Sequence, residues 1–119
     1  MEERAKYRVD RPSKRDESGD SLYIDAHAMR ANAAGFEAVG IAMDLISCVW
    51  WPTKQPFSYD PTRLAESLGK ALPARGYTPD ALERNAAEVE SFFVVLPDGT
   101  WAPSPQYFSI ANGNPGRAS

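Results

Sequence analysis

The side chains that could carry out chemistry are few and widely spaced in this chain. Asp25 and His27 stand two positions apart, so on a strand they would share one face, as metal ligands sometimes do. No third or fourth ligand stands near them, which argues against a metal site. Cys48 with His27 could form a nucleophile and its base. Cys48, however, lies within an apolar helical pattern, where a cysteine is expected to be an inert part of the core.

Two other catalytic arrangements are not supported either. Glu88 and Glu90 are two positions apart on an expected helix, so their carboxylates point in different directions and do not form a pair. The sequence contains no glycine-rich loop of the kind that binds phosphate. The sequence therefore predicts a protein that is not an enzyme and that holds no cofactor and no metal.

The composition is typical of one globular domain in the cytoplasm. The chain has 119 residues, 43% of them hydrophobic, and its single cysteine excludes a disulfide within one chain. The first twenty residues contain no apolar stretch that could act as a secretory signal. No apolar run approaches the ~20 residues that span a bilayer. We therefore expect a soluble protein of the reducing cytoplasm that does not associate with a membrane.

The charges divide the chain into three parts. Residues 1–20 carry equal numbers of basic and acidic groups and few large apolar residues, so we expect a flexible, mixed-charge arm. Residues 111–119 are small, polar and turn-forming, so we expect a disordered tail. The folded domain is expected at 21–110. Residues 21–119 together carry a net charge of −3, which is the wrong sign for a strong non-specific nucleic-acid binder.

The first half of the domain predicts a strand and a central helix. Residues 21–25 alternate apolar and polar side chains, which is typical of a short strand. From about Ala33 the pattern becomes helical, with Asn32 as a possible cap and Pro52 as the stop. Its apolar stripe, which should be buried, consists of Phe36, Val39, Met43, Ile46 and Trp50, broadened by Ile41, Ala42, Leu45 and Val49.

Two more helices are predicted to begin with the same device, a capping residue followed by proline. Asp60-Pro61 starts one helix and Thr78-Pro79 starts the next. A brief extended pairing is expected at Phe57–Tyr59, ahead of the first of them. The residues expected to face the core are Leu64, Ala65 and Leu68 in one helix and Leu82, Ala86 and Val89 in the other.

Residues 92–101, FFVVLPDGTW, have the pattern of a β-hairpin. Five apolar residues lead into the turn Pro97–Thr100, and the returning strand from Trp101 must be short because Pro103 and Pro105 follow. The whole order is helix, brief strand, helix, helix, strand, turn, strand. It predicts an α+β fold of the winged-helix type, in which a three-helix core is closed by a C-terminal hairpin, the wing, at residues 92–103.

Over roughly residues 22–108, a set of positions matches the pattern of a known family: Gly35-Phe36, Gly40, Trp50, Asp60, Leu64-Ala65, Phe92-Phe93 and Asp98-Gly99. At these positions the chain resembles the N-terminal domain of YdaU-like prophage proteins. These are packing and turn positions, not catalytic ones. The resemblance implies a phage or mobile-element context and, by analogy with replication proteins of that family, work near DNA.

The first functional hypothesis is an accessory, DNA-associated or regulatory role without catalysis. A winged helix usually places its third helix in the major groove of DNA. In the expected third helix, Arg84 and Asn85 could contact base edges, but Asp80, Glu83, Glu88 and Glu90 would repel phosphate. The remaining basic residues that could contact DNA are Lys70, Arg75, Arg11, Lys14 and Arg15.

The alternative hypothesis is a winged helix that binds protein, either a host factor or its own copy, without binding DNA. Trp50 and Trp51 are adjacent, so a regular helix cannot bury both on one face. One of them is therefore expected at a surface or against the wing. The aromatic residues that could anchor a partner are Trp51, Trp101, Tyr107 and Phe108. The same tryptophans could instead pack the wing onto the first helix.

Overall fold

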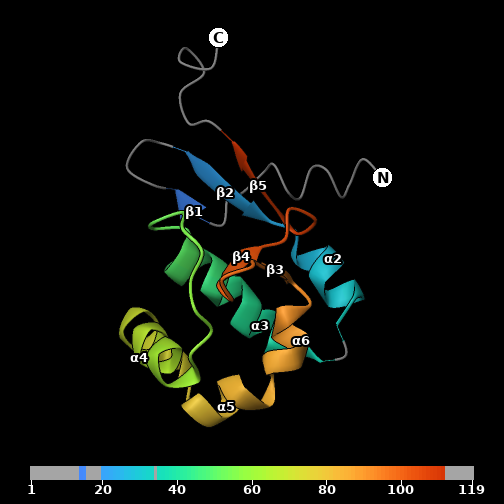
Figure 1. The fold of residues 1–119 in the computed structure, drawn as a ribbon. Coiled ribbons are helices and arrows are strands. Elements are labelled where there is room, and N and C mark those ends of the chain that lie inside the picture. The colour runs from blue at the N-terminus through green and yellow to red at the C-terminus, as the bar shows by residue number, and fades with distance from the viewer. Residues whose placement is uncertain (1–13, 16–19, 34, 112–119) are drawn as a thin grey trace.

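The computed structural model describes residues 14–15, 20–33 and 35–111 of the chain. Most of the expected arm and the expected tail from residue 112 onward lie outside these residues. The described elements, in chain order, are β1 (Lys14–Arg15), β2 (Ser21–Ile24), α2 (Ala26–Ala31), α3 (Phe36–Asp44), η1 (Leu45–Trp50), α4 (Pro61–Ala71), η2 (Pro73–Arg75), α5 (Pro79–Arg84), α6 (Ala86–Glu90), β3 (Phe93–Val95), β4 (Trp101–Pro103) and β5 (Phe108–Ala111). The fold is mixed α+β, with α3 between a small sheet and the helices α4 and α5 (Figure 1).

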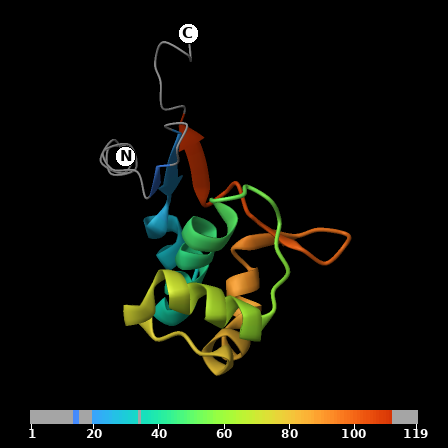
Figure 2. The same ribbon diagram turned by 90° about the vertical axis from the view of Figure 1, so that its left-hand side faces the viewer.

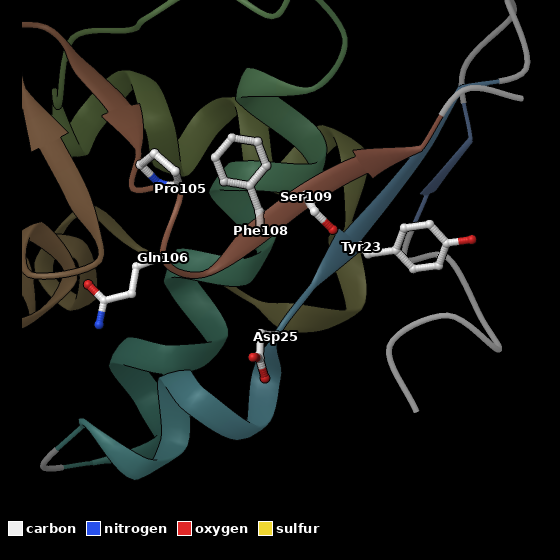
Figure 3. A pocket seen from close by; sticks show the side chains of 6 residues that line it. All are labelled: Tyr23, Asp25, Pro105, Gln106, Phe108 and Ser109. Atoms are coloured by element: carbon white, nitrogen blue, oxygen red, sulfur yellow. The ribbon is translucent and has the colours of Figure 1, made fainter. Parts of the chain in front are cut away.

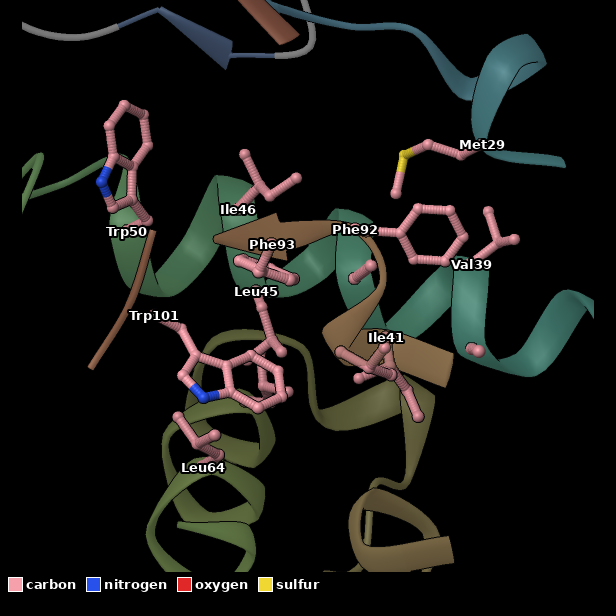
Figure 4. Close-up of a cluster of buried hydrophobic side chains, with 14 of the residues drawn as sticks. Met29, Val39, Ile41, Leu45, Ile46, Trp50, Leu64, Phe92, Phe93 and Trp101 are labelled. Atoms are coloured by element: carbon pink, nitrogen blue, oxygen red, sulfur yellow. The ribbon is translucent and has the colours of Figure 1, made fainter. Parts of the chain in front are cut away.

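The central helix is α3 together with η1, a π-helical segment that continues it. The wider turn is visible in the hydrogen bond from the Trp51 N–H to the Ile46 carbonyl oxygen, which spans five residues (2.9 Å). The chain leaves the helical path at Pro52, as expected. Side chains from both segments line the core in Figure 4. The buried members are Ala38, Val39, Ile41, Ala42, Leu45, Ile46 and Trp50.

The start of this helix differs from the prediction. Residues 26–31 form a separate short helix, α2, which Asp25 caps by accepting a hydrogen bond from the Ala28 N–H (3.0 Å). Asn32 is the C-cap of α2, not the N-cap of the next helix, and α3 begins at Phe36. The expected burial of Phe36 is wrong, because this first helical residue is 77% exposed.

The helices α4 and α5 begin where the sequence predicts. The Asp60 carboxylate accepts a hydrogen bond from the Thr62 N–H (3.1 Å), and the Thr78 hydroxyl accepts one from the Ala81 N–H (3.2 Å). The expected third helix is not continuous: it is broken at Asn85 into α5 and α6. The residues of these helices that are buried in the core are Leu64, Ala65, Leu68, Leu82 and Val89.

The predicted hairpin is confirmed as the antiparallel pair β3–β4. Val95 lies opposite Trp101, and Phe93 lies opposite Pro103. Gly99 in the turn has φ +87°, a conformation that glycine adopts without steric cost. Phe57 forms an isolated bridge with Trp101, which confirms the expected extended pairing at that position. Figure 2 shows the hairpin extending away from the helices.

A second sheet, which the sequence analysis did not predict, joins the two ends of the described chain. Its strand order is β1-β2-β5, and both pairings are antiparallel. Ser21 lies opposite Ala111, and Ile24 lies opposite Phe108. The Asp25 N–H then donates to the Tyr107 carbonyl oxygen (2.9 Å), which extends the pairing by one position.

Aromatic contacts attach this sheet and the hairpin to the helical core. The Phe108 ring meets the Trp50 ring edge-on at 5.2 Å between centroids, and the Tyr107 ring meets Phe92 in the same way at 5.1 Å. Leu22 on β2 is fully buried. Within the described residues, no helix has the length and apolar character needed to cross a membrane.

Candidate interaction surface

Arg84, the main residue expected to contact DNA bases, is held by two carboxylates of the chain itself. Its Nη1 lies 2.8 Å from Asp80 Oδ2 on the preceding turn of α5, and its Nη2 lies 3.3 Å from Glu37 Oε2 on α3. Both pairs are exposed, so each contributes little to stability. They nevertheless neutralise the guanidinium charge locally. A phosphate or a base edge would have to compete with two carboxylates for this group.

Asn85, the second residue expected to contact DNA bases, is also engaged within the fold. It is the C-cap of α5, and its side-chain Nδ2 donates to the Ala81 carbonyl oxygen (2.8 Å). The same carbonyl oxygen also accepts the backbone N–H of Asn85 (3.2 Å), so main chain and side chain of this residue both bond to the last turn of the helix. The amide is therefore part of the break between α5 and α6.

The other basic residues do not gather beside the third helix. Lys70 is exposed in the last turn of α4, and Arg75 in η2 forms an ion pair with Asp44. Lys14 and Arg15 form β1, on the side of α3 opposite to α5 (Figure 1). Arg11 lies outside the described residues. The structure therefore brings no basic patch together from the described members of this set.

A buried carboxylate fixes the link between α4 and α5 onto α3. Asp44, at the end of α3, accepts a hydrogen bond from the Tyr77 hydroxyl (2.5 Å), and its Oδ2 lies 3.3 Å from Arg75 Nε. Burial raises the pKa of Tyr77 well above its ordinary value, and the hydrogen bond and negative charge of Asp44 raise it further. The neutral tyrosine thus remains the donor, and the arrangement is a structural contact between distant segments.

The four aromatic residues expected to anchor a partner do not form an exposed surface. Trp51 is 1% exposed, Trp101 and Tyr107 are also buried, and Phe108 is half-buried. Trp101 stacks on Tyr59 with centroids 4.3 Å apart. The expectation of exposure is therefore wrong for three of the four. Their burial agrees with the alternative that the tryptophans pack the hairpin onto the helices.

Trp51 is buried although Trp50 beside it is also buried. The reason is the π-helical segment, whose wider turn changes the direction of successive side chains compared with an α-helix. The two indole rings lie 6.2 Å apart between centroids, with their planes tilted by 42°. The Lys54 ammonium covers Trp51, with its Nζ 3.9 Å from the ring centroid.

Among the described residues, the most exposed large apolar side chain belongs to Phe36, and its two chain neighbours contact charged residues of α5 and α6. Its neighbour Gly35 donates its N–H to Glu88 Oε2 on α6 (3.0 Å), and its other neighbour Glu37 pairs with Arg84. We call this group the Phe36 surface. It consists of Phe36, Glu37, Asp80, Arg84 and Glu88: one exposed aromatic ring, three acidic groups and one basic group.

A small cavity of about 150 Å³ lies beside the sheet, where β2 meets α2 and the loop after β4 leads into β5 (Figure 3). Its lining residues are Tyr23, Asp25, Pro105, Gln106, Phe108 and Ser109. Asp25 is already the cap of α2, and His27 lies exposed within that helix, so the two do not share a strand face as the sequence suggested. In the described ranges, no three His, Cys, Asp or Glu side chains are grouped as a metal site would need.

The chain is a mixed α+β protein, and its helices carry the acidic Phe36 surface. Comparison of the chain with protein-family models, with curated proteins and with solved structures found no match. Its function is therefore inferred from its own geometry.

Proposed function

We propose that this chain is a non-enzymatic winged-helix protein of phage or mobile-element type that binds another protein, not DNA. The winged-helix assignment is supported by the order α3–α4–α5/α6 followed by the hairpin β3–β4. It is further supported by the bridge of Phe57 to Trp101, which adds a single antiparallel pairing to the hairpin from the segment before α4. The phage context rests on the resemblance to YdaU-like proteins described above.

The observation that favours protein binding over DNA binding is the pairing of Arg84 with two carboxylates of the chain itself. In a DNA-binding winged helix, the third helical segment must present basic or neutral donors to the groove. Here the basic side chain of that segment is paired with Glu37 and Asp80, and Asn85 is used as a helix cap. Approach of a phosphate backbone would also bring it close to the exposed carboxylates of Glu83 and Glu90, which costs affinity.

The Phe36 surface has the composition of a docking site for a basic partner. Phe36 offers a large apolar ring that is 77% exposed, and its charged neighbours carry a net charge of −2. Aromatic anchors contribute strongly when they enter an apolar pocket, and a charged rim adds specificity and association rate. The expected partner therefore presents an apolar pocket with lysine or arginine at its edge.

The test uses this chain as bait to capture a binding partner, the prey, from a bacterial lysate. The purified prey is then titrated against the chain to measure its affinity. Burying a phenylalanine ring is worth about 1.5–3 kcal/mol, so Phe36→Ala should weaken the affinity by roughly 10–100-fold. The matched control is Val94→Ala, which removes an exposed apolar side chain from the hairpin and should change nothing. Raising the salt concentration should slow association, because the charged rim is screened.

Two results would overturn the proposal. One is a prey that binds Phe36→Ala as well as it binds the unaltered chain. The other is binding to duplex DNA, measured by fluorescence anisotropy at two salt concentrations, that falls steeply with salt and is lost in Arg84→Ala or Lys70→Ala. The second result would establish the DNA-associated role instead.

A further inference from the structure

The outer edge of β5 has no neighbouring strand among the described residues. In the order β1-β2-β5, only one side of β5 is paired, and its partner is β2. The hydrogen bond from the Asp25 N–H to the Tyr107 carbonyl oxygen shows which residues of β5 direct their backbone groups toward β2. Since antiparallel strands alternate their hydrogen-bonding direction, Tyr107, Ser109 and Ala111 face β2. The backbone N–H and C=O groups of Phe108 and Ile110 therefore face the open edge.

This edge also lacks the features that usually prevent strand-to-strand association. Natural edge strands carry lysine, proline, bulges or other charged groups. On the opposite side of the sheet, β1 consists of Lys14 and Arg15. In contrast, β5 reads FSIA, and the sequence contains no charged residue between Asp98 and Arg117. Ile110 is 42% exposed beside this uncharged edge.

We propose that β5 pairs with β5 of a second copy of this chain, antiparallel and about a two-fold axis. In this register Phe108 lies opposite Ile110 of the other copy. By the two-fold symmetry, Ile110 lies opposite Phe108 of the other copy. Each pair exchanges two hydrogen bonds, so the four outward groups of each strand are all satisfied. The two three-stranded sheets become one continuous sheet in the dimer.

The second copy fits this edge better than a strand of other composition. The pairing places a β-branched side chain beside an aromatic one in both halves, which is a favourable cross-strand combination. The edge carries no charge, so two acidic copies meet there without placing like charges opposite each other. The strand has only four residues, so the dimer is expected to be of the weak, transient class.

The test is sedimentation velocity of the full chain over a concentration range from about 10 μM to 1 mM, which suits weak association. The unaltered chain should shift from monomer to dimer with rising concentration. Ile110→Pro removes one outward N–H per copy and leaves the bonds to β2, because a proline is tolerated where its nitrogen faces an open edge. It should weaken dimerisation at least about tenfold, the equivalent of about 1.4 kcal/mol.

Ile110→Lys provides a second variant, since it introduces the charge that edge strands normally carry. Its matched control is Val95→Lys, at a hairpin position of similar exposure, 44%. Both Ile110 variants should dimerise at least about tenfold more weakly than the unaltered chain, and Val95→Lys should dimerise like the unaltered chain. Circular dichroism and urea midpoints of all variants verify that the monomer remains folded.

Hydrogen exchange of single amides gives a readout that a general loss of stability would not produce. The amides of Phe108 and Ile110 should become protected as concentration rises, while that of Ser109 should be protected throughout. A chain that stays monomeric at 1 mM overturns the proposal. So does a dimer that persists in both Ile110 variants, or an Ile110 amide protected at every concentration, which would indicate another occupant of the edge.

This inference is independent of the proposed function. The Phe36 surface lies on the helical side, and Phe36→Ala should dimerise normally. A dimer that is lost in Phe36→Ala and kept in Ile110→Pro would place the contact between copies on the Phe36 surface and refute the pairing of β5. Failure of prey binding with normal dimerisation would refute only the proposed function.

Discussion

Replacing Tyr77 with phenylalanine should destabilise the fold by about 2 kcal/mol, although it removes a single oxygen atom. The Tyr77 hydroxyl donates to Asp44 Oδ2, and Asp44 is buried at the end of α3. A hydrogen bond to a charged group contributes roughly 1.5–3 kcal/mol. Its loss leaves the Asp44 carboxylate with the ion pair to Arg75, whose Nε lies 3.3 Å away. For a domain of 60–100 residues this corresponds to a decrease in Tm of about 10 °C.

The assay is urea unfolding at pH 7 of four proteins that form a double-mutant cycle: the unaltered chain, Tyr77→Phe, Asp44→Asn and the double variant. If the two side chains act through their mutual bond, the double variant should be more stable than the sum of the two losses implies, by about 1–2 kcal/mol. The control is Tyr23→Phe, at a half-buried tyrosine on β2, which should change stability by less than about 0.5 kcal/mol.

Two outcomes would refute the reasoning about this contact. If Tyr77→Phe costs no more than Tyr23→Phe, the hydroxyl does not stabilise Asp44. If the two losses simply add, the side chains act separately and the link between α4 and α5 is held by its packing alone.

Three further predictions concern stability. Trp101→Ala should cost about 3–5 kcal/mol in urea unfolding, because the indole stacks on Tyr59 within the core, and a cost below 1 kcal/mol would contradict that packing. Gly99→Ala should cost roughly 1 kcal/mol, since φ is +87° in the hairpin turn, and thermal unfolding measures it. The urea midpoint should be constant up to about pH 10 and then fall with rising pH. The cause is that burial raises the pKa of Tyr59 to about 12 and that of Tyr77 further, so the unfolded tyrosines ionise first. Tyr77→Phe should make this alkaline decrease shallower, and an unchanged decrease would contradict the role of that group.

The sequence predicted those parts of the fold that depend on local chemistry. Asp60 and Thr78 were identified as caps because each is followed by a proline that favours the first helical position, and both accept the expected hydrogen bonds. The hairpin was predicted because an Asp-Gly turn separates two apolar runs, and its pairing is as expected. These signals lie within a few residues of one another, so one sequence is enough to recognise them.

The parts that depend on distant contacts were missed. β5 has four residues and takes its strand character from β2, which lies at the other end of the described chain. The helix α2 has six residues, too few to show a helical period. The break at Asn85 was hidden because an asparagine inside an amphipathic pattern does not by itself distinguish a cap from a helical position.

The errors at the candidate surface have two local causes. The spacing of Phe36 fits the apolar stripe, but α3 begins at this residue, so its ring is exposed. A regular α-helix cannot bury both Trp50 and Trp51 on one face, and the π-helical segment removes that restriction. The acidic character of the third helix was predicted, but the pairing of Arg84 with Glu37 required the fold.

The pairing of β2 with β5 has a consequence for protein synthesis. β2 emerges from the ribosome early, but the strand that covers it is the last element described. Until then, the growing polypeptide exposes a ready template for aggregation, with Leu22 deprived of its final packing neighbours. We therefore expect a nascent chain stalled before Phe108 to be recognised by chaperones or proteases more readily than one whose residues up to Ala111 have left the ribosome.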